Sequence, residues 1–215
     1  EACLASLRGY GVDVESVALT QFGRLGIYFI ETGANQRPST VVYDRDGSAI
    51  SLAPPDTYDW PSIFRGADWF HTTGITPSLS ENAAQSVLTA VQEAKARGLT
   101  VSLDLNFRKK LWRWRPGTEA RALAGEIMNG ILPHVDVLIG NEEDAADVLG
   151  IHAEGSDVES GVIAADRYRD VARRIHARYG NLSRIAITLR ESISASHNNW
   201  GGMLYETATD TAYFA

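Results

Sequence analysis

The feature that most constrains the fold is an alternation of strand and helix patterns that begins near residue 67. Short apolar runs typical of buried strands alternate with longer segments whose apolar residues recur every three or four positions, as in helices. We predict strands at 67–71, 99–103, 135–139, 185–189 and 203–206, and helices at 78–98, 118–130, 141–149 and 164–179. This order favours right-handed crossovers, and therefore an α/β fold with a mostly parallel sheet that carries helices on both faces.

The first 52 residues follow a different pattern. Residues 1–9 are interpreted as the end of a helix, closed by Gly9 and Gly11. Four short runs rich in Val, Ile, Tyr, Phe and Thr follow, at 16–20, 26–32, 39–45 and 48–52. Because no helix pattern separates them and Asp46-Gly47 is a hairpin turn signal, we predict a small antiparallel sheet.

Composition excludes several classes of protein. The 215 residues contain 20 Lys and Arg against 27 Asp and Glu, a net charge of −7. This acidity argues against nucleic acid as the partner, because binding to phosphate backbones depends on clustered basic residues. No apolar run approaches the roughly 20 residues of a membrane helix, so no membrane partner is expected. The lone Cys3 excludes an internal disulfide and favours a reducing, cytoplasmic location.

One basic segment stands out from the acidic chain. Residues 108–115 contain five of the 20 basic side chains together with two tryptophans. A nucleic-acid patch, a membrane-surface segment and a loop rim are all compatible with it. We favour the rim, in which the Trp side chains pack and the basic ones stay solvated, because the segment is short and its surroundings are acidic.

Familiar catalytic motifs are missing. The sequence has no Walker A sequence, no G-x-G-x-x-G, no H-E-x-x-H and no G-x-S-x-G. The five histidines also lack the spacing of metal ligands. The sequence therefore disfavours four classes of enzyme: P-loop NTPases, dinucleotide oxidoreductases, zinc proteases and serine hydrolases.

The topology itself selects candidate site residues. Ligands of open parallel sheets bind beyond the carboxyl ends of the strands, and the loops there are 71–74, 104–108, 140–144 and 190–192. Within the second loop, Asp104, Asn106 and Arg108 would project to one side if the chain stayed extended. Arg108 would then bind a carboxylate or phosphate. An ordinary turn closed by an Asx-type bond is the alternative.

Asn141 to Asp144 begins a helix directly after a strand. Asn is a favoured N-cap, and acidic residues suit the first turn of a helix, so a purely structural role is one interpretation. The other is that part of this cluster binds Mg²⁺ through water beside nucleotide phosphates.

Several segments together resemble the ribokinase/PfkB carbohydrate kinase family, and most closely its 2-keto-3-deoxygluconate kinase branch. Residues 26–31 and 37–49 resemble the strands of the family's lid. Asp104-Leu105-Asn106-Phe107-Arg108, followed by Leu111-Trp112, resembles the D-x-N-x-R-x-x-L-W segment of that branch. Gly140 to Asp144 resembles the N-x-x-E element, and 187–190 the strand before the nucleotide loop.

The resemblance implies a ribokinase-like three-layer α/β fold plus a β lid, with residues 1–15 and 53–215 in the core and 16–52 in the lid. It implies an ATP- and Mg²⁺-dependent kinase that phosphorylates a small sugar acid, 2-keto-3-deoxygluconate. The lid residues Tyr28, Tyr43 and Arg45 would contact the sugar acid, and Arg108 would bind its carboxylate or the transferred phosphoryl group. The nucleotide side would contain Asn141, Asp144, Thr188 and Arg190. No side chain is implied as a direct metal ligand; Asp144 would act through water.

Two departures from the family pattern matter. The fourth position of N-x-x-E is Asp144, one methylene shorter than Glu. The G-A-G-D segment, whose Asp is the family's general base, and the N-terminal sugar-binding segment do not occur in the sequence. We therefore expect a central fragment that lacks the catalytic base and is inactive alone.

Two other functions remain open. One is a different PfkB-type sugar kinase, such as a 5-dehydro-2-deoxygluconokinase. The other is a sugar-acid-binding regulator that has kept the fold without catalysis. The lid strands would also allow a homo-oligomer to form through uncovered strand edges.

Overall fold

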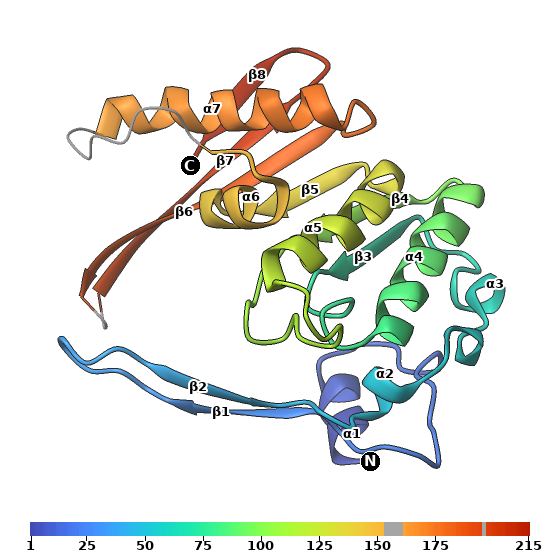
Figure 1. Ribbon diagram of the computed structural model, residues 1–215. Helices are drawn as coiled ribbons and strands as arrows, with labels where there is room; N and C mark the ends of the chain where they lie inside the picture. The colour runs from blue at the N-terminus through green and yellow to red at the C-terminus, as the bar shows by residue number, and fades with distance from the viewer. Residues whose placement is uncertain (153–160, 195–196) are drawn as a thin grey trace.

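The computed structural model describes residues 1–152, 161–194 and 197–215. Its main element is a six-stranded sheet in the order β3-β4-β5-β6-β7-β8 (Figure 1). The strands are β3 (Trp69–Thr73), β4 (Thr100–Asp104), β5 (Val137–Gly140), β6 (Arg184–Ser194), β7 (His197–Glu206) and β8 (Thr211–Phe214). The first four are parallel, and the last two are antiparallel to their neighbours. The prediction of a mostly parallel α/β sheet is confirmed.

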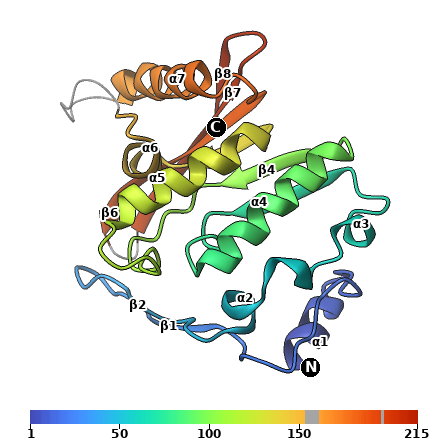
Figure 2. The same ribbon diagram turned by 45° about the vertical axis from the view of Figure 1, so that its right-hand side comes forward.

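The helices that join the parallel strands lie on one face of this sheet (Figures 1 and 2). They are α4 (Glu81–Ala96), α5 (Ala120–Ile131) with the short η2 (Leu132–His134), α6 (Glu142–Leu149) and α7 (Gly161–Arg178). Because strand order follows chain order, successive right-handed crossovers all fall on the same side. Under them, Val101, Leu103 and Ile185 are at most 1% exposed and form the centre of the core.

The opposite face of the sheet is more open. Trp69 and Tyr213, on the two outermost strands, are 53% and 54% exposed, and Leu204 is 39% exposed. Within the described ranges, no second layer of helices covers this face. The predicted fold class is confirmed. In the described residues, however, the helices that connect the parallel strands lie on one face, because the strands follow one another in chain order across the sheet.

The helix starts follow from capping chemistry. Ser80 caps α4, with its Oγ accepting the N–H of Ala83 at 3.0 Å. The helix start predicted at residue 78 is too early, because the cap is Ser80 and the hydroxyl of Ser78 instead donates to the carbonyl of Ile75. Asn141 caps α6 in a full capping box, and Gly150 ends that helix with a φ of 67°. In the described part of the chain, no helix is both long and apolar enough to cross a bilayer.

The predicted small sheet is a two-stranded hairpin. β1 (Ile27–Glu31) and β2 (Thr40–Asp44) pair antiparallel, joined by residues 32–39. The strand predicted at 16–20 does not form, and 48–52 is not a strand but contains the helix α2 (Ala49–Leu52). Gly47, with a φ of 65°, turns the chain into that helix rather than into a hairpin, so the Asp46-Gly47 prediction is also wrong. We call β1 and β2 the lid hairpin; the division at residues 16–52 stays a prediction.

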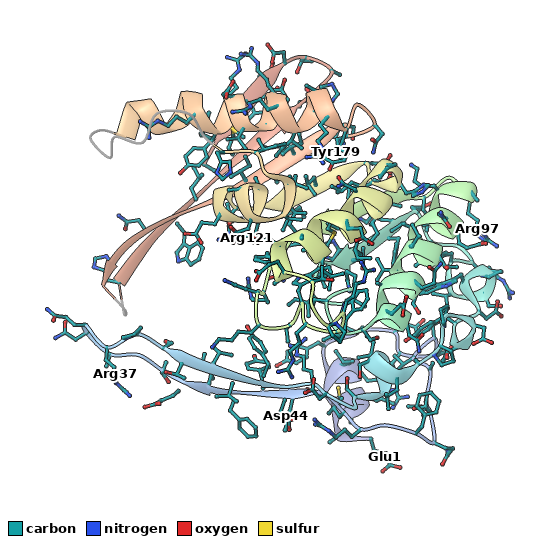
Figure 3. All side chains as sticks on the ribbon, in the orientation of Figure 1. Glu1, Arg37, Asp44, Arg97, Arg121 and Tyr179 are labelled. Atoms are coloured by element: carbon teal, nitrogen blue, oxygen red, sulfur yellow. The ribbon has the colours of Figure 1, made fainter. Side chains whose placement is uncertain are left out.

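The lid hairpin is flanked by short helices. α1 (Ala2–Gly9) precedes it, in agreement with the sequence pattern, and η1 (Pro55–Thr57) and α3 (Trp60–Ile63) follow α2. Arg24 binds the lid hairpin at its base: its guanidinium contacts the carboxylate of Asp44 and donates to the carbonyl of Asp46 at 2.8 Å. Figure 3 labels Asp44 near this base and Arg37 toward the far end.

β6 and β7 extend the sheet as a long hairpin arm. Their pairing runs from Arg184–Glu206 out to Ser194–His197. The loop predicted at 190–192 is therefore wrong, since these residues continue β6. The arm and the lid hairpin project to the same side of the molecule in both ribbon views.

Candidate active site

The carboxyl ends of the parallel strands meet at one edge of the sheet. Thr73 lies beside Asp104, and Asp104 beside Ile139 in the next strand. Gly140 in turn pairs with Ile187. The loops that follow β3, β4 and β5 therefore start side by side, as predicted.

The loop after β4 is a tight turn rather than an extended strand exit. Asn106 has a φ of 39°, in the left-handed region that a short polar side chain tolerates. Its backbone N–H donates to Asp104 Oδ1 at 3.1 Å, and its side-chain amide donates to the Thr73 hydroxyl at 3.2 Å. The expectation that Asp104, Asn106 and Arg108 lie in one extended run is wrong, because the strand ends at Asp104. The turn interpretation is confirmed.

Arg108 follows this turn and is exposed. Its Nη1 donates to the carbonyl of Phe107 at 3.0 Å, which folds the side chain back along its own loop. The N–H of Phe107 donates to Asp144 Oδ1 at 3.0 Å, although the two residues are 37 positions apart. A guanidinium is thus presented at the sheet edge by a loop that is bonded to the start of α6.

Asp144 and Asn141 form the first turn of α6. Asp144 is 6% exposed, and its Oδ2 accepts the N–H of Asn141 at 3.3 Å. In return, Asn141 Oδ1 accepts the N–H of Asp144 at 2.7 Å. Burial raises the pKa of Asp144 above its ordinary value and the charge of Asp104 adds to this rise, while the two backbone donors and Arg108 oppose it.

Asp104 completes an acidic pair at this edge. Burial raises the pKa of its carboxyl, whereas the N–H of Asn106 and the charges of His71 and Arg108 lower it. Two carboxyl groups with raised pKa values within electrostatic reach of one arginine are typical of a functional site, although structural networks produce the same effect.

The two β6 residues predicted on the nucleotide side lie on the neighbouring strand. Thr188 is exposed, and its hydroxyl is 3.5 Å from the carbonyl oxygen of Gly140, just before Asn141. Arg190 pairs with Trp200 in the backbone of the arm, but its side chain falls outside the described part of the structure.

The three predicted lid residues share one face of the lid hairpin. Tyr28 and Tyr43 are direct cross-strand partners, so their side chains lie on the same side. The guanidinium of Arg45 lies over the Tyr43 ring, 5.5 Å from its centre. We call this side the Tyr43 face; it joins two aromatic rings to one positive charge.

Two contacts connect the lid region to the sheet edge. Arg113, in the loop that also carries Arg108, forms an ion pair with Asp46 at the base of the lid hairpin. A cavity of about 970 Å³ is lined by both Arg45 and Thr73, and Thr73 accepts a hydrogen bond from Asn106. Of the predicted site residues that the structure describes, Arg45 alone lines this cavity. Among the described contacts, Arg45 lies against Tyr43 and Arg108 bonds to its own loop, so the structure forms a lid group and an edge group without bringing them into contact.

The basic-aromatic segment behaves as a rim. Trp112 is 2% exposed and belongs to the core, and Trp114 Nε1 donates to the carbonyl of Pro77 at 3.2 Å. Lys109, Lys110 and Arg113 are exposed. This is the packing that we favoured from the sequence.

Sequence reasoning passed over Gly74 and Thr73 as individual site residues. A Cβ on Gly74 would lie 2.0 Å from the Leu105 carbonyl oxygen, and the N–H of Gly74 donates to the Asp104 carbonyl at 2.8 Å. The sequence does contain an indication of this contact, because a glycine directly after a strand at the ligand edge indicates that another backbone segment approaches closely.

Carboxylates at this edge suit Mg²⁺ only in part. Among the described residues, no group of three or more His, Cys, Asp or Glu side chains is arranged to hold a metal ion. Mg²⁺ commonly keeps several waters and binds through one or two carboxylates together with substrate phosphates. Asp104 and Asp144 therefore suit hydrogen bonding to the water ligands of a hydrated Mg²⁺ ion rather than direct coordination of the metal.

The model of the pfkB family of carbohydrate kinases matches residues 1–170. The chain belongs to this family.

Several named sugar-acid kinases are similar to this chain. A 2-dehydro-3-deoxygalactonokinase from Haloferax volcanii is 36% identical over 154 residues, which are 72% of this chain and 46% of the relative. A 2-dehydro-3-deoxygluconokinase from Thermoproteus tenax is 36% identical over 146 residues, 67% of this chain and 42% of the relative. The solved 2-dehydro-3-deoxygluconokinase from Thermotoga maritima is 42% identical with a TM-score of 0.87, covering 99% of this chain and 60% of that one. The chain thus spans about half the length of the curated relatives it matches.

Proposed function

We propose that the protein containing this chain transfers the γ-phosphoryl group of ATP to a hydroxyl of 2-keto-3-deoxygluconate, also called 2-dehydro-3-deoxygluconate. The observation that carries the proposal is the presentation of Arg108 at the ligand edge, on a loop bonded to α6 through Phe107 and Asp144. An arginine fork matches the planar carboxylate of a sugar acid. The solved relative of 42% identity bears the name of this activity.

Each group of residues has a role in this proposal. Tyr28, Tyr43 and Arg45 close over the sugar acid from the Tyr43 face, and Arg45 adds a second positive charge for an acidic ligand. Closure excludes water, which protects ATP from hydrolysis. Arg108 binds the substrate carboxylate or stabilises the charge of the transferred phosphoryl group.

The nucleotide side is the edge formed by α6 and β6. Asn141, Thr188 and Arg190 approach the nucleotide, and Asp144 faces the Mg²⁺ network through water. Mg²⁺, when bound with ATP, neutralises the phosphate charge. The residues of this chain supply position and charge, and the deprotonating base of the family is not among them, so we expect these 215 residues alone to be inactive.

The deciding experiment is a coupled assay on the intact protein with ATP, Mg²⁺ and one sugar at a time. The sugars are 2-keto-3-deoxygluconate, its galacto epimer, 5-dehydro-2-deoxygluconate and fructose. We expect the first to be phosphorylated with the highest kcat/KM. Faster turnover of another sugar would assign a different kinase of the family, and sugar-acid binding without turnover would assign a regulator. Phosphoryl transfer by residues 1–215 alone would contradict the expected inactivity.

We also propose that the lid hairpin pairs with a second copy of the chain. The side opposite the Tyr43 face carries Ile27, Phe29 and Val42, and the latter two are 59% and 56% exposed. An isolated two-stranded hairpin is marginal in water, so covering this Phe29 face would stabilise it.

A further inference from the structure

Asp144 makes more backbone contacts than a helix cap requires. One carboxylate oxygen accepts the N–H of Asn141 and closes the capping box. The other accepts the N–H of Phe107, which lies outside α6, in the loop after β4. The residue is 6% exposed, so this second contact is made in a region from which water is largely excluded.

The loop that receives this contact turns sharply. It passes through the left-handed conformation of Asn106, which is held by bonds to Asp104 and Thr73. Phe107 is the next residue and Arg108 the one after it. The Phe107 bond to Asp144 therefore sets the direction in which the chain leaves the turn, and with it the place from which the Arg108 guanidinium starts.

Each carboxylate oxygen of Asp144 accepts one backbone hydrogen bond. The carboxylate is therefore an acceptor shared by two elements that are distant in the sequence, and its remaining lone pairs leave the contact with Mg²⁺ through water possible.

We propose that Asp144 is a positioning residue, which holds the Arg108 loop against the first turn of α6 and so links the sugar-acid side of the site to its nucleotide side. The inference rests on the proposed function for the identity of the two ligands. Its physical content, the coupling of Phe107 to Asp144, does not depend on the reaction.

The test compares three variants of the intact protein. Asp144→Ala removes both accepting oxygens, and Asp144→Asn keeps one. Ser80→Ala is the matched control, because it removes an N-cap of similar kind from α4 and leaves the bond between Phe107 and Asp144 in place. Glu143→Gln is the charge control, since it removes an exposed acidic group from the same helical turn.

Two measurements are made on each variant. In amide hydrogen exchange, we expect the N–H of Phe107 to exchange at least about 10-fold faster in Asp144→Ala than the change in global stability accounts for, with a smaller effect in Asp144→Asn. In kinetics, we expect KM for the sugar acid to rise at least about 10-fold in Asp144→Ala. The Mg²⁺ concentration for half-maximal rate should rise by a smaller factor than KM for the sugar acid, because Asp144 bonds the loop directly and reaches the ion only through water. Neither control should change Phe107 exchange beyond its global effect.

The outcomes separate the alternatives. Unchanged Phe107 exchange, or a Mg²⁺ requirement that rises by a larger factor than KM for the sugar acid, would overturn the positioning role. If Asp144→Ala does not fold, Asp144→Asn decides by the same two criteria. If the intact wild-type protein phosphorylates no sugar acid, the proposed function fails, while the Phe107 exchange result still decides whether Asp144 anchors the loop.

Discussion

Gly74 and Leu105 are in backbone contact: a Cβ atom on Gly74 would lie 2.0 Å from the Leu105 carbonyl oxygen. The two residues belong to neighbouring loops at the ligand edge of the sheet. Since the obstacle is backbone rather than a flexible side chain, no rotamer change can relieve it. The closeness of these two loops therefore depends on the absence of a side chain at position 74.

We expect Gly74→Ala to lower the free energy of unfolding by about 1–3 kcal/mol, the usual cost of overpacking a tight site. Gly130→Ala is the control, because Gly130 lies in α5 with nothing within 4 Å of its ideal Cβ. That change should be neutral or stabilising by up to about 1 kcal/mol, since alanine favours helix. Urea unfolding of both variants measures the difference, and equal stabilities would contradict the contact.

Asp136 should contribute to stability through a buried backbone donor. Its carboxylate accepts Lys95 Nζ at 2.8 Å and the N–H of Val101 at 2.8 Å. Asp136→Ala leaves the N–H of the buried Val101 without this partner, which costs about 1–3 kcal/mol. Glu93→Ala, which removes the surface ion pair with Arg97, should change stability by less than about 0.5 kcal/mol. Similar losses in both variants would argue against the importance of the Val101 bond.

Arg108 and Arg45 should discriminate acidic from neutral sugars. In the intact protein, we expect Arg108→Ala to raise KM for the sugar acid roughly 10- to 150-fold, the equivalent of about 1.5–3 kcal/mol for a charge-assisted hydrogen bond. Arg45→Ala should act in the same direction, and KM for fructose should change little in either variant. Arg121→Ala, which breaks a surface pair with Asp147 on the helical side, serves as the control. An equal loss for acidic and neutral sugars would exclude charge recognition.

The contribution of Asp104 to the free energy of unfolding should depend on pH in a direction that its raised pKa sets. Burial raises the pKa of its carboxyl, so between the unfolded value of about 3.9 and the raised value the folded state binds more protons. Its contribution to stability therefore falls as pH rises through this window. Replacing Asp104 with Asn removes the loss, so the stability of the variant relative to wild type should increase with pH and then level off.

Asp59 provides the opposite sign in the same titration. The side-chain and backbone bonds with Ser62 lower its pKa, so its contribution is present above the unfolded value and is lost as pH falls through the folded one. Asp59→Asn should therefore become less stable relative to wild type as pH rises. Thermal unfolding at a series of pH values checks both variants, and curves of the same sign would contradict the assignment.

Pairing through the Phe29 face has a direct test. Phe29→Lys should convert a dimer to a monomer in light scattering of the intact protein, because a buried unpaired charge opposes association. Gln92→Lys, on the exposed side of α4, adds the same charge elsewhere and should leave the mass unchanged. A wild-type monomer, or a dimer that survives Phe29→Lys, would exclude this interface.

The sequence predicted the sheet well where burial dictates pattern. The buried residues of β4, β5 and β6 include Val101, Leu138 and Ile185. They belong to short apolar runs of the kind that forms buried strands, so the sequence pattern predicted these strands correctly. The two failed strands, 16–20 and 48–52, contain β-favouring residues but lack a partner strand, and strand propensity depends on such partners. The β6–β7 arm was missed beyond Leu189 because its polar residues carry no alternating apolar pattern.

The candidate site could be predicted in its parts but not in its connections. Topology alone indicated that the loops after Thr73, Asp104 and Gly140 would meet. No spacing rule reveals that Phe107 donates to Asp144, because a bond between residues 37 positions apart depends on tertiary packing. The exact turn at Asn106 was likewise one of two alternatives until the backbone conformation selected it.

The clamp that Arg24 places on Asp44 and Asp46 gives the lid hairpin a mechanical property. Five residues at about 3.4 Å each make a lever of roughly 17 Å, so a 10° rotation at the base moves the free end by roughly 3 Å. Arg113 contacts the same base through its ion pair with Asp46. A small rotation at this base would therefore displace the far ends of the two strands by several times the displacement at the base.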